Sequence, residues 1–236
     1  MSGITLVLLA VGCTATVAFT LVERTANHPM VDPALFERRP FSLSVGIGVI
    51  FNFTLYGGLF CLALDLHGVH GLDPFQTGLV MLPVTLVTGT TVYLSSRAIA
   101  RFGEWPVMTG GLMTGAIGAA LVAVNPTHGA TSLLVVSTIP LGLTAMAMPA
   151  ITATAMAGAP ADRVGLASGV LNAARQTGGA FGVAVLGALL RVSGHVELHT
   201  VDAVIAGALA IGTALAVTGR HARDRPASQT TIPGAQ

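Results

Sequence analysis

Apolar residues fill the chain in long stretches, and short segments rich in proline, glycine or charge separate these stretches. An α-helix needs about 20 apolar residues to cross the hydrocarbon core of a bilayer. Stretches of about this length fall at residues 4–22, 42–64, 75–95, 106–124, 131–157, 164–190 and 201–219. The pattern therefore predicts an all-α, polytopic membrane helix bundle of about seven spans.

The composition agrees with lipid as the main solvent of this chain. Hydrophobic residues make up 53% of the sequence and charged residues only 9%, whereas a soluble domain carries about 25% charged residues. The first apolar stretch lacks the basic segment that opens a secretory signal, so we interpret it as a retained span. The formal net charge of +1 argues against a nucleic-acid partner.

The distribution of arginines predicts the orientation in a cell membrane, because cytoplasmic loops collect basic residues. With a cytoplasmic C-terminus, that side holds most of the 11 basic residues, all of them arginines, and the other side holds only Arg191. The arginines on the cytoplasmic side are Arg24, Arg38, Arg39, Arg97, Arg101, Arg163, Arg220, Arg223 and Arg225. The odd number of spans then places the N-terminus outside.

The polar segments divide the chain into three parts. Residues 1–40 form the first span and a cytoplasmic linker, and residues 41–219 form a six-span bundle. Residues 220–236 form a polar tail that we expect to be disordered, because it has too few apolar residues to pack.

Arg175 lies at the centre of a predicted span that contains no acidic residue. A charged side chain at mid-bilayer costs about 2.5 kcal/mol or more, so it normally faces protein or a watery cavity. Helical spacing places Ser168, Asn172, Gln176 and Gly179 on the same face. We interpret this face as the lining of a cavity. The alternative is a structural arginine that binds carbonyls of a neighbouring helix or extends to the cytoplasmic surface.

Two other spans carry polar stripes. In the span at 42–64, Asn52 and Tyr56 follow Ser44 and Gly48 at four-residue spacing, and we expect Asn52 and Tyr56 to line the same cavity. The span at 75–95 carries hydroxyl groups at Thr85, Thr88, Thr91 and Ser95. These hydroxyl groups either face a cavity or bind carbonyls of their own helix.

Glycines at four-residue spacing allow helix backbones to approach closely in lipid. The pairs Gly165/Gly169 and Gly178/Gly182 flank Arg175 in the same span, and we expect them to pack against a neighbouring helix.

The sequence predicts no enzyme, no cofactor and no metal site. His67 and His70 lie with Asp65 and Asp73 near a glycine-containing loop, which we interpret as a solvated loop. The chain has no phosphate-binding glycine loop and no lysine, which argues against drive by ATP. Cys13 and Cys61 are interpreted as small apolar thiols rather than as a disulfide or a metal pair.

One long motif resembles a known family of transporters. The stretch ASGVLNAARQTGGAFGVAVLG (167–187) is similar to the penultimate-helix signature of the fourteen-span drug:proton antiporters (EmrB/QacA type) in the major facilitator superfamily. Three further stretches of this chain resemble the same family, in the same order: HPMVDPALFERRPF (28–41), GLDPFQTGLVMLP (71–83) and SRAIARFGEW (96–105). The resemblance implies the C-terminal six-helix bundle of such a transporter, with one preceding span.

The implied function is one half of a proton-coupled secondary active exporter of drug-like or amphipathic molecules. Alternating access in this family uses two bundles, so we expect no activity without an N-terminal half, supplied by a separate chain or by a second copy. The alternative is a non-transporting membrane module that binds a hydrophobic ligand or scaffolds a partner. The expected partners are therefore the lipid bilayer, a small amphipathic substrate and the missing half.

This sequence departs from the family at two points. In the cytoplasmic gating loop, Arg97, Arg101 and Gly103 match the family pattern, but Ala100 stands where the family has an acid. Trp105 and Pro106 likewise replace the family's trailing basic pair. The acidic residues Asp65, Asp73, Glu104 and Asp162 all fall at predicted loops or span edges. The sequence therefore predicts no proton carrier inside this bundle.

Overall fold

A computed structural model describes residues 33–68, 71–124, 142–192 and 198–224, together with positions 7, 10–15, 17–18 and 21–22 of the first predicted span. The described residues form helices and short turns without a β-strand, which confirms the all-α prediction. Most of the predicted linker, the first part of the span at 131–157 and the tail from residue 225 lie outside the described residues.

The long helices match the apolar stretches and continue beyond them. The elements are α2 (Pro33–Glu37), α3 (Arg39–Gly68), α4 (Pro74–Phe102), α5 (Glu104–Val124), α7 (Ala147–Gly158), a 3₁₀ turn η1 (Ala161–Arg163), α8 (Val164–Val192) and α9 (Leu198–Asp224). Helix α9 thus extends past residue 219, where we expected the polar tail to begin.

Local sequence fixes both ends of α4. Asp73 forms a capping box with Gln76: the Gln76 backbone N–H donates to Asp73 Oδ1 at 2.8 Å, and the Asp73 N–H donates to Gln76 Oε1 at 3.1 Å. Pro74 occupies the first turn, where its missing N–H costs nothing. Gly103 ends the helix with φ 83°, a backbone conformation that favours glycine. Helix α5 begins at the next residue.

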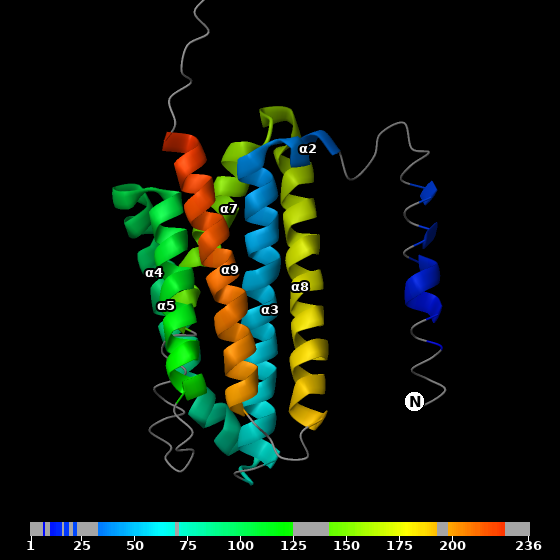
Figure 1. Cartoon of the computed structure of the whole chain (residues 1–236), viewed down its shortest axis with the longest axis vertical. Helices are drawn as coiled ribbons and strands as arrows, with labels where there is room; N and C mark the ends of the chain where they lie inside the picture. Colours follow the sequence, from blue (N-terminus) through cyan, green and yellow to red (C-terminus); the bar gives the residue numbers. More distant parts are fainter. Residues whose placement is uncertain are drawn as a thin grey trace, which may run out of the picture.

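Helix α3 forms the centre of the bundle. It packs against α8, α9 and α7, while α5 packs against α9 and α7. Figure 1 shows the long helices nearly parallel, with α3 between α9 and α8. The described positions of the first span, drawn in blue, stand apart from this bundle, and their apolar side chains are exposed.

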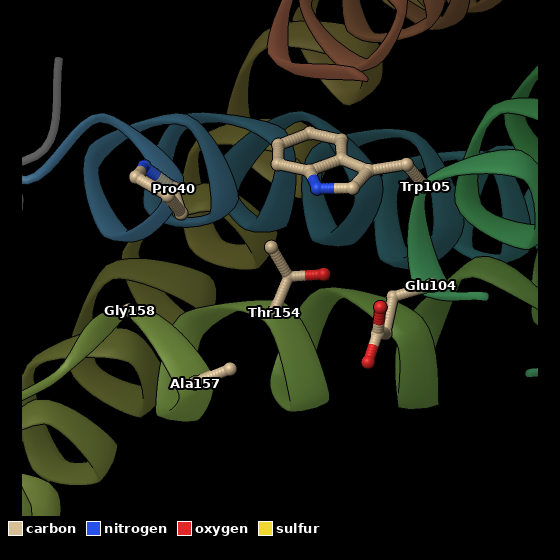
Figure 2. A pocket seen from close by; sticks show the side chains of 6 residues that line it. All are labelled: Pro40, Glu104, Trp105, Thr154, Ala157 and Gly158. Carbon is tan, nitrogen blue, oxygen red and sulfur yellow. The ribbon is translucent and has the colours of Figure 1, made fainter. Parts of the chain in front are cut away.

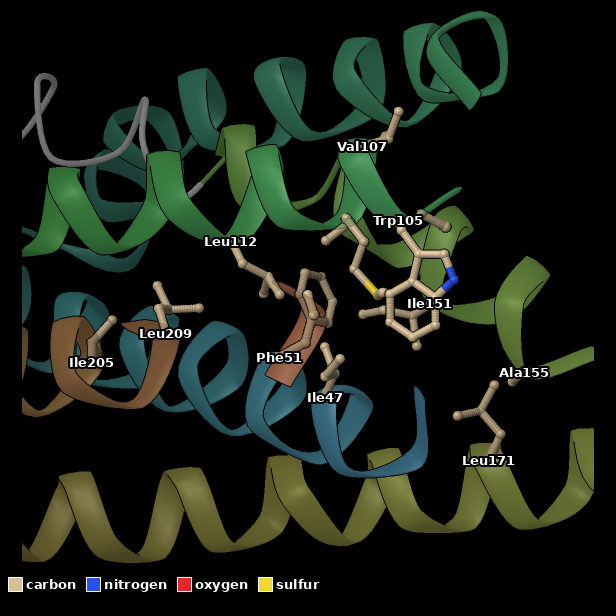
Figure 3. Close-up of a cluster of buried hydrophobic side chains, with 14 of the residues drawn as sticks. Ile47, Phe51, Trp105, Val107, Leu112, Ile151, Ala155, Leu171, Ile205 and Leu209 are labelled. Carbon is tan, nitrogen blue, oxygen red and sulfur yellow. The ribbon is translucent and has the colours of Figure 1, made fainter. Parts of the chain in front are cut away.

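The core lies between α3, α5, α7 and α9. Phe51 and Ile47 of α3 meet Leu112 of α5, Ile151 of α7 and Leu209 of α9 in one buried cluster (Figure 3). In lipid, such contacts contribute through close packing rather than through removal of apolar surface from water.

Length and composition identify α3, α4, α5 and residues Leu198–His221 as candidate membrane spans among the described helices. These helices agree with a polytopic membrane bundle. Helix α8 has 29 residues, which is long enough to cross a membrane, but it is not in this set. Its polar residues around Arg175 lower its mean hydropathy.

Helix α8 contacts α3 through glycine. An added Cβ on Gly178 would lie 2.8 Å from Cα of Val49, and one on Gly182 would lie 2.8 Å from Cα of Phe53. Gly57 of α3 meets the Gly182 backbone from the other side, so the two helices touch backbone to backbone. Gly165 and Gly169 differ, because an added Cβ there would meet no described atom within 4 Å.

Gly182→Ala is therefore expected to separate α3 from α8. The new methyl group would overlap the Phe53 backbone, which has no flexible end that can move away. Overpacking of this kind costs about 1–3 kcal/mol, or a decrease in Tm of about 2–10 °C. Thermal unfolding in detergent measures the effect. Gly169→Ala is the matched control on the same helix, and an equal loss of Tm in both variants would contradict the contact.

Candidate functional site

The predicted polar face of α8 divides between two sides of the helix. Ser168, Asn172 and Gln176 are exposed on this chain, Gly179 is buried, and Arg175 is half-buried between them. Arg175 therefore lies at the edge of the contact with α3, beside an open polar surface.

The side chain of Arg175 is held by α3. Its Nε donates to Oδ1 of Asn52 at 3.5 Å, and Asn52 is only 3% exposed. The stem of the arginine crosses Gly48, where an added Cβ would lie 3.0 Å from the arginine Cγ. The small residue at position 48 thus makes room for the stem, and the buried amide fixes its direction.

Most of the guanidinium remains available. A guanidinium group carries five N–H donors, and the contact with Asn52 is the only hydrogen bond of Arg175 among the described residues. No acidic partner of Arg175 occurs in that part of the chain either. Arg175 therefore binds no backbone carbonyl of a neighbouring helix among the described residues. Such binding is one form of the structural interpretation of this arginine.

Tyr56 extends the cluster one turn further along α3. Its ring covers Gly179, where an added Cβ would lie 2.9 Å from the tyrosine Cδ2. Tyr56 is 46% exposed and is an electrostatic neighbour of Arg175. We call Asn52, Tyr56 and Arg175 the seam cluster. It combines a cation, an amide and a phenol ring, which together suit a ligand that has both an aromatic surface and oxygen acceptors.

Two of the four hydroxyl groups in the stripe of α4 bind carbonyls of their own helix. Thr85 donates to the carbonyl of Met81, and Thr91 donates to that of Val87. Ser95 instead donates to the Met146 carbonyl at 2.9 Å and so connects α4 to the segment before α7. For Thr85, Thr91 and Ser95, the structure shows hydrogen bonds to backbone carbonyls, the second of the two interpretations of this stripe.

The two arginines of the predicted gating loop lie against aromatic rings. Arg97 donates to the Tyr93 hydroxyl at 3.0 Å, and its guanidinium lies 4.8 Å from the Tyr93 ring centroid. The guanidinium of Arg101 lies 5.3 Å from the ring of Phe102. Both contacts lie within α4, and neither arginine forms an ion pair with another described residue. Gly103 supplies the single-residue link to α5.

Two acids, Asp65 and Asp202, lie within the last or first turns of their helices, and packing buries both of them. Asp65 lies within α3 and is only 5% exposed. Asp202 of α9 interacts electrostatically with Asp65 and with Cys61, one turn earlier on α3. Oδ2 of Asp202 is buried without a hydrogen-bond partner among the described residues. The sequence did not indicate this pair because both acids lie near helix ends, where acidic residues are common. Only the packing of α3 against α9 buries them.

Within the described residues, no group of three or more His, Cys, Asp or Glu side chains is arranged to hold a metal ion. His67 contacts the carbonyl of Leu72 through Nδ1 at 2.8 Å, whereas His70 lies outside the described residues. Cys13 and Cys61 are both free thiols, of which only Cys61 is buried.

Sequence comparisons identify related proteins. A sequence model of the Major Facilitator Superfamily matches residues 43–235. A tetracenomycin C resistance and export protein of Streptomyces glaucescens is 37% identical over 79% of this chain and 35% of its own length. The multidrug resistance protein Stp of Mycobacterium tuberculosis is 32% identical over 83% of this chain and 36% of its own length. A methylenomycin A resistance protein of Bacillus subtilis is 31% identical over 81% of this chain and 42% of its own length. The chain thus spans less than half the length of these relatives.

A double-mutant cycle tests the contact between Arg175 and Asn52. Asn52→Ala removes the only described acceptor of Arg175, so Arg175→Met should cost less in that background. We expect a coupling energy of about 1 kcal/mol from denaturant unfolding in detergent. Asn52→Ala combined with Gln176→Ala is the control cycle and should be additive. Additivity in both cycles would exclude the contact.

Proposed function

The chain belongs to the major facilitator superfamily, and on that premise we propose that it is the C-terminal bundle of a secondary active exporter of drug-like, amphipathic molecules. As a member of this family it is a multi-pass membrane transporter rather than an enzyme. The names of its relatives, which include resistance and export proteins, support the class of substrate. The order of the motifs along the chain supports the C-terminal position.

The observation that carries this proposal is the position of the seam cluster beside an exposed polar face. Polar groups that face hydrocarbon without partners cost several kcal/mol each. The exposed side chains of Ser168, Asn172 and Gln176 therefore require water or protein in front of α8. A second bundle that encloses a wet cavity provides both. That bundle is either an N-terminal half, in the same polypeptide or in another, or a second copy of this chain.

The seam cluster also favours particular substrates. Arg175 presents unused donors at a fixed place, so it binds carbonyl, phenolate or carboxylate oxygens. The exposed part of the Tyr56 ring offers a face for aromatic stacking. Flat aromatic molecules that carry several oxygens match both features.

Proton coupling is part of the proposal, and Asp65 and Asp202 are its carriers in this chain. Adjacent carboxylates in a poorly solvated site interact strongly, so the binding of one proton depends on the state of both groups. Burial of Asp65 and the proximity of Asp202 support this role.

Transport requires both bundles, because alternating access moves one bundle against the other. The test is uptake of a fluorescent aromatic substrate into proteoliposomes with an imposed pH gradient. We expect no uptake with this chain alone and gradient-driven uptake when an N-terminal half is added. Uptake that never exceeds that of the N-terminal half alone would reject the proposal in favour of a non-transporting membrane module.

Arg175→Met should lower transport by the complete assembly by about tenfold or more, because the substrate loses a charged donor. Insertion of the chain, measured by its yield in the membrane fraction, should not change. Thr177→Val is the matched control, since its hydroxyl is occupied by the Ala173 carbonyl on the same helix. Equal transport by Arg175→Met and the control would remove Arg175 from the substrate site.

Asp65→Asn should abolish the dependence of uptake on the pH gradient while substrate binding is retained, because an amide carries no titrating proton. Uptake rates at several imposed gradients measure the dependence. Asp73→Asn is the control, since asparagine caps a helix as well as aspartate and Asp73 is exposed. A normal response to the gradient in Asp65→Asn would exclude this carrier.

A further inference from the structure

A pocket apart from the seam cluster lies at the end of the bundle that we predict to be cytoplasmic. Its volume is about 330 Å³, and it lies where α3 and α5 begin and α7 ends. The lining residues are Pro40, Glu104, Trp105, Thr154, Ala157 and Gly158 (Figure 2). One water molecule needs only about 30 Å³, so this pocket has room for a small organic molecule.

Small residues create this space. Gly158 lies against the start of α3, where an added Cβ would be 3.0 Å from the backbone nitrogen of Phe41. This close approach holds the end of α7 against α3. Ala157 and Gly158, which have little or no side chain, leave the space next to Thr154 unfilled.

Thr154 lines the pocket with a hydroxyl group that lacks a partner. The residue is only 4% exposed, and its hydroxyl is buried with no hydrogen-bond partner among the described residues. Thr152, on the same helix, shows the usual arrangement: its hydroxyl donates to the Met148 carbonyl at 3.1 Å. Buried polar groups are nearly always hydrogen-bonded, because leaving one unpaired is costly. A molecule in the pocket can supply the bond that Thr154 lacks.

Trp105 offers a second donor to the same space. The far edge of its ring packs against Gly219 of α9, and the residue is only 4% exposed. Figure 2 shows the indole nitrogen on the edge of the ring nearer Thr154. No hydrogen bond from this N–H is found among the described residues. Indole N–H groups usually find a partner when buried, so Trp105 and Thr154 both require an acceptor.

The lining offers no uncompensated charge to a ligand. Glu104 is the one ionisable residue among the lining residues, and it already takes part in another interaction of the chain. A charged ligand would therefore lose water without gaining a counter-ion, which is costly. Apart from the polar groups of Glu104, Thr154 and Trp105, the pocket is lined by apolar side chains and glycine. A neutral molecule with an apolar body fits this lining.

We infer that this pocket binds a neutral molecule through a carbonyl oxygen. Such an oxygen has two lone pairs, so it accepts from the Trp105 N–H and from the Thr154 hydroxyl together. Ketones, amides and esters have this group. Phospholipids also carry ester carbonyls where their chains meet the headgroups, and Trp105 is the second residue of a candidate membrane span. The site is independent of the proposed transport function.

Trp105 is the only tryptophan of the chain, so its indole N–H gives a single signal in a proton–nitrogen NMR spectrum of tryptophan side chains. The probe is cyclohexyl methyl ketone, titrated into the purified chain in dodecyl maltoside. We expect a saturable downfield shift of the indole proton, because donation to a carbonyl deshields it. Isopropenylcyclohexane has a methylene group in place of the oxygen, so it should bind about fivefold more weakly. No saturable shift with the ketone, or equal binding of both compounds, would overturn the inference.

Two ions of similar shape test whether the ligand is neutral. Cyclohexanecarboxylate keeps an oxygen acceptor but is an anion, and cyclohexylmethylammonium is a cation. Both should bind about tenfold more weakly than the ketone, because the pocket has no free counter-charge. If either ion binds as tightly as the ketone, the neutral class of ligand is wrong.

Variants assign the binding to the pocket. Thr154→Val keeps the shape and removes the hydroxyl, so the ketone should bind about fivefold more weakly, whereas isopropenylcyclohexane should bind as before. Thr152→Val is the matched control and should leave the titration unchanged. If Thr154→Val binds the ketone like the unmodified chain, the pocket is not the site. The comparison of the two compounds needs no variant, so it tests the ligand class even if a variant fails to fold.

Nanodiscs distinguish a lipid carbonyl from a free molecule. Discs of phosphatidylglycerol with ester-linked chains are compared with discs of its ether-linked analogue, which has no carbonyl. If a lipid occupies the pocket, only the ester discs show the downfield indole signal, and they prevent the ketone response. If the ligand is a free molecule, the ketone shifts the signal equally in both discs. Absence of both patterns overturns the site, and because no transport is measured, the result leaves the proposed exporter function untouched.

Discussion

The rest of the structure depends on the backbone contact between α3 and α8. In lipid, helices gain little from hiding apolar side chains, so a stable contact requires close packing of atoms. Gly178 and Gly182 bring α8 directly onto Val49 and Phe53 of α3. At this separation, Arg175 extends across Gly48 to the amide of Asn52. A larger side chain at the contact would move the guanidinium away from its only described acceptor.

The contact also explains how a permanent cation is tolerated inside an apolar bundle. The stem of Arg175 packs on α3, and the half-exposed head keeps most of its donors for water or a ligand. The cost of a charge at this depth is smaller when water or fixed dipoles surround it. Under the proposed function, the same half-buried position leaves the guanidinium within reach of a substrate. On that proposal, structural support and ligand binding are compatible roles of one arginine.

The sequence predicts the helices and the polar faces because both follow from periodicity along one segment. Asn52 and Arg175 were identified separately in this way, but their contact joins residues 123 positions apart and depends on how two helices pack. The glycine pairs show the same limit: identical spacing gives a close contact at Gly178/Gly182 and open space at Gly165/Gly169. Burial of Asp65 beside α9 and burial of the Thr154 hydroxyl are likewise properties of packing. No local pattern in the sequence distinguishes these residues from ordinary ones.

Helix α3 carries parts of two polar sites. Asn52 and Tyr56 belong to the seam cluster in its middle, and Asp65 lies close to Asp202 near its end. The proposed proton coupling places Asp65 on the same helix as Asn52 and Tyr56. On that proposal, a change in proton binding that alters the packing of α3 on α9 also acts on the contact between α3 and α8. The glycine contact leaves little room to change the distance between α3 and α8, so sliding or rotation is the motion expected to change the reach of Arg175.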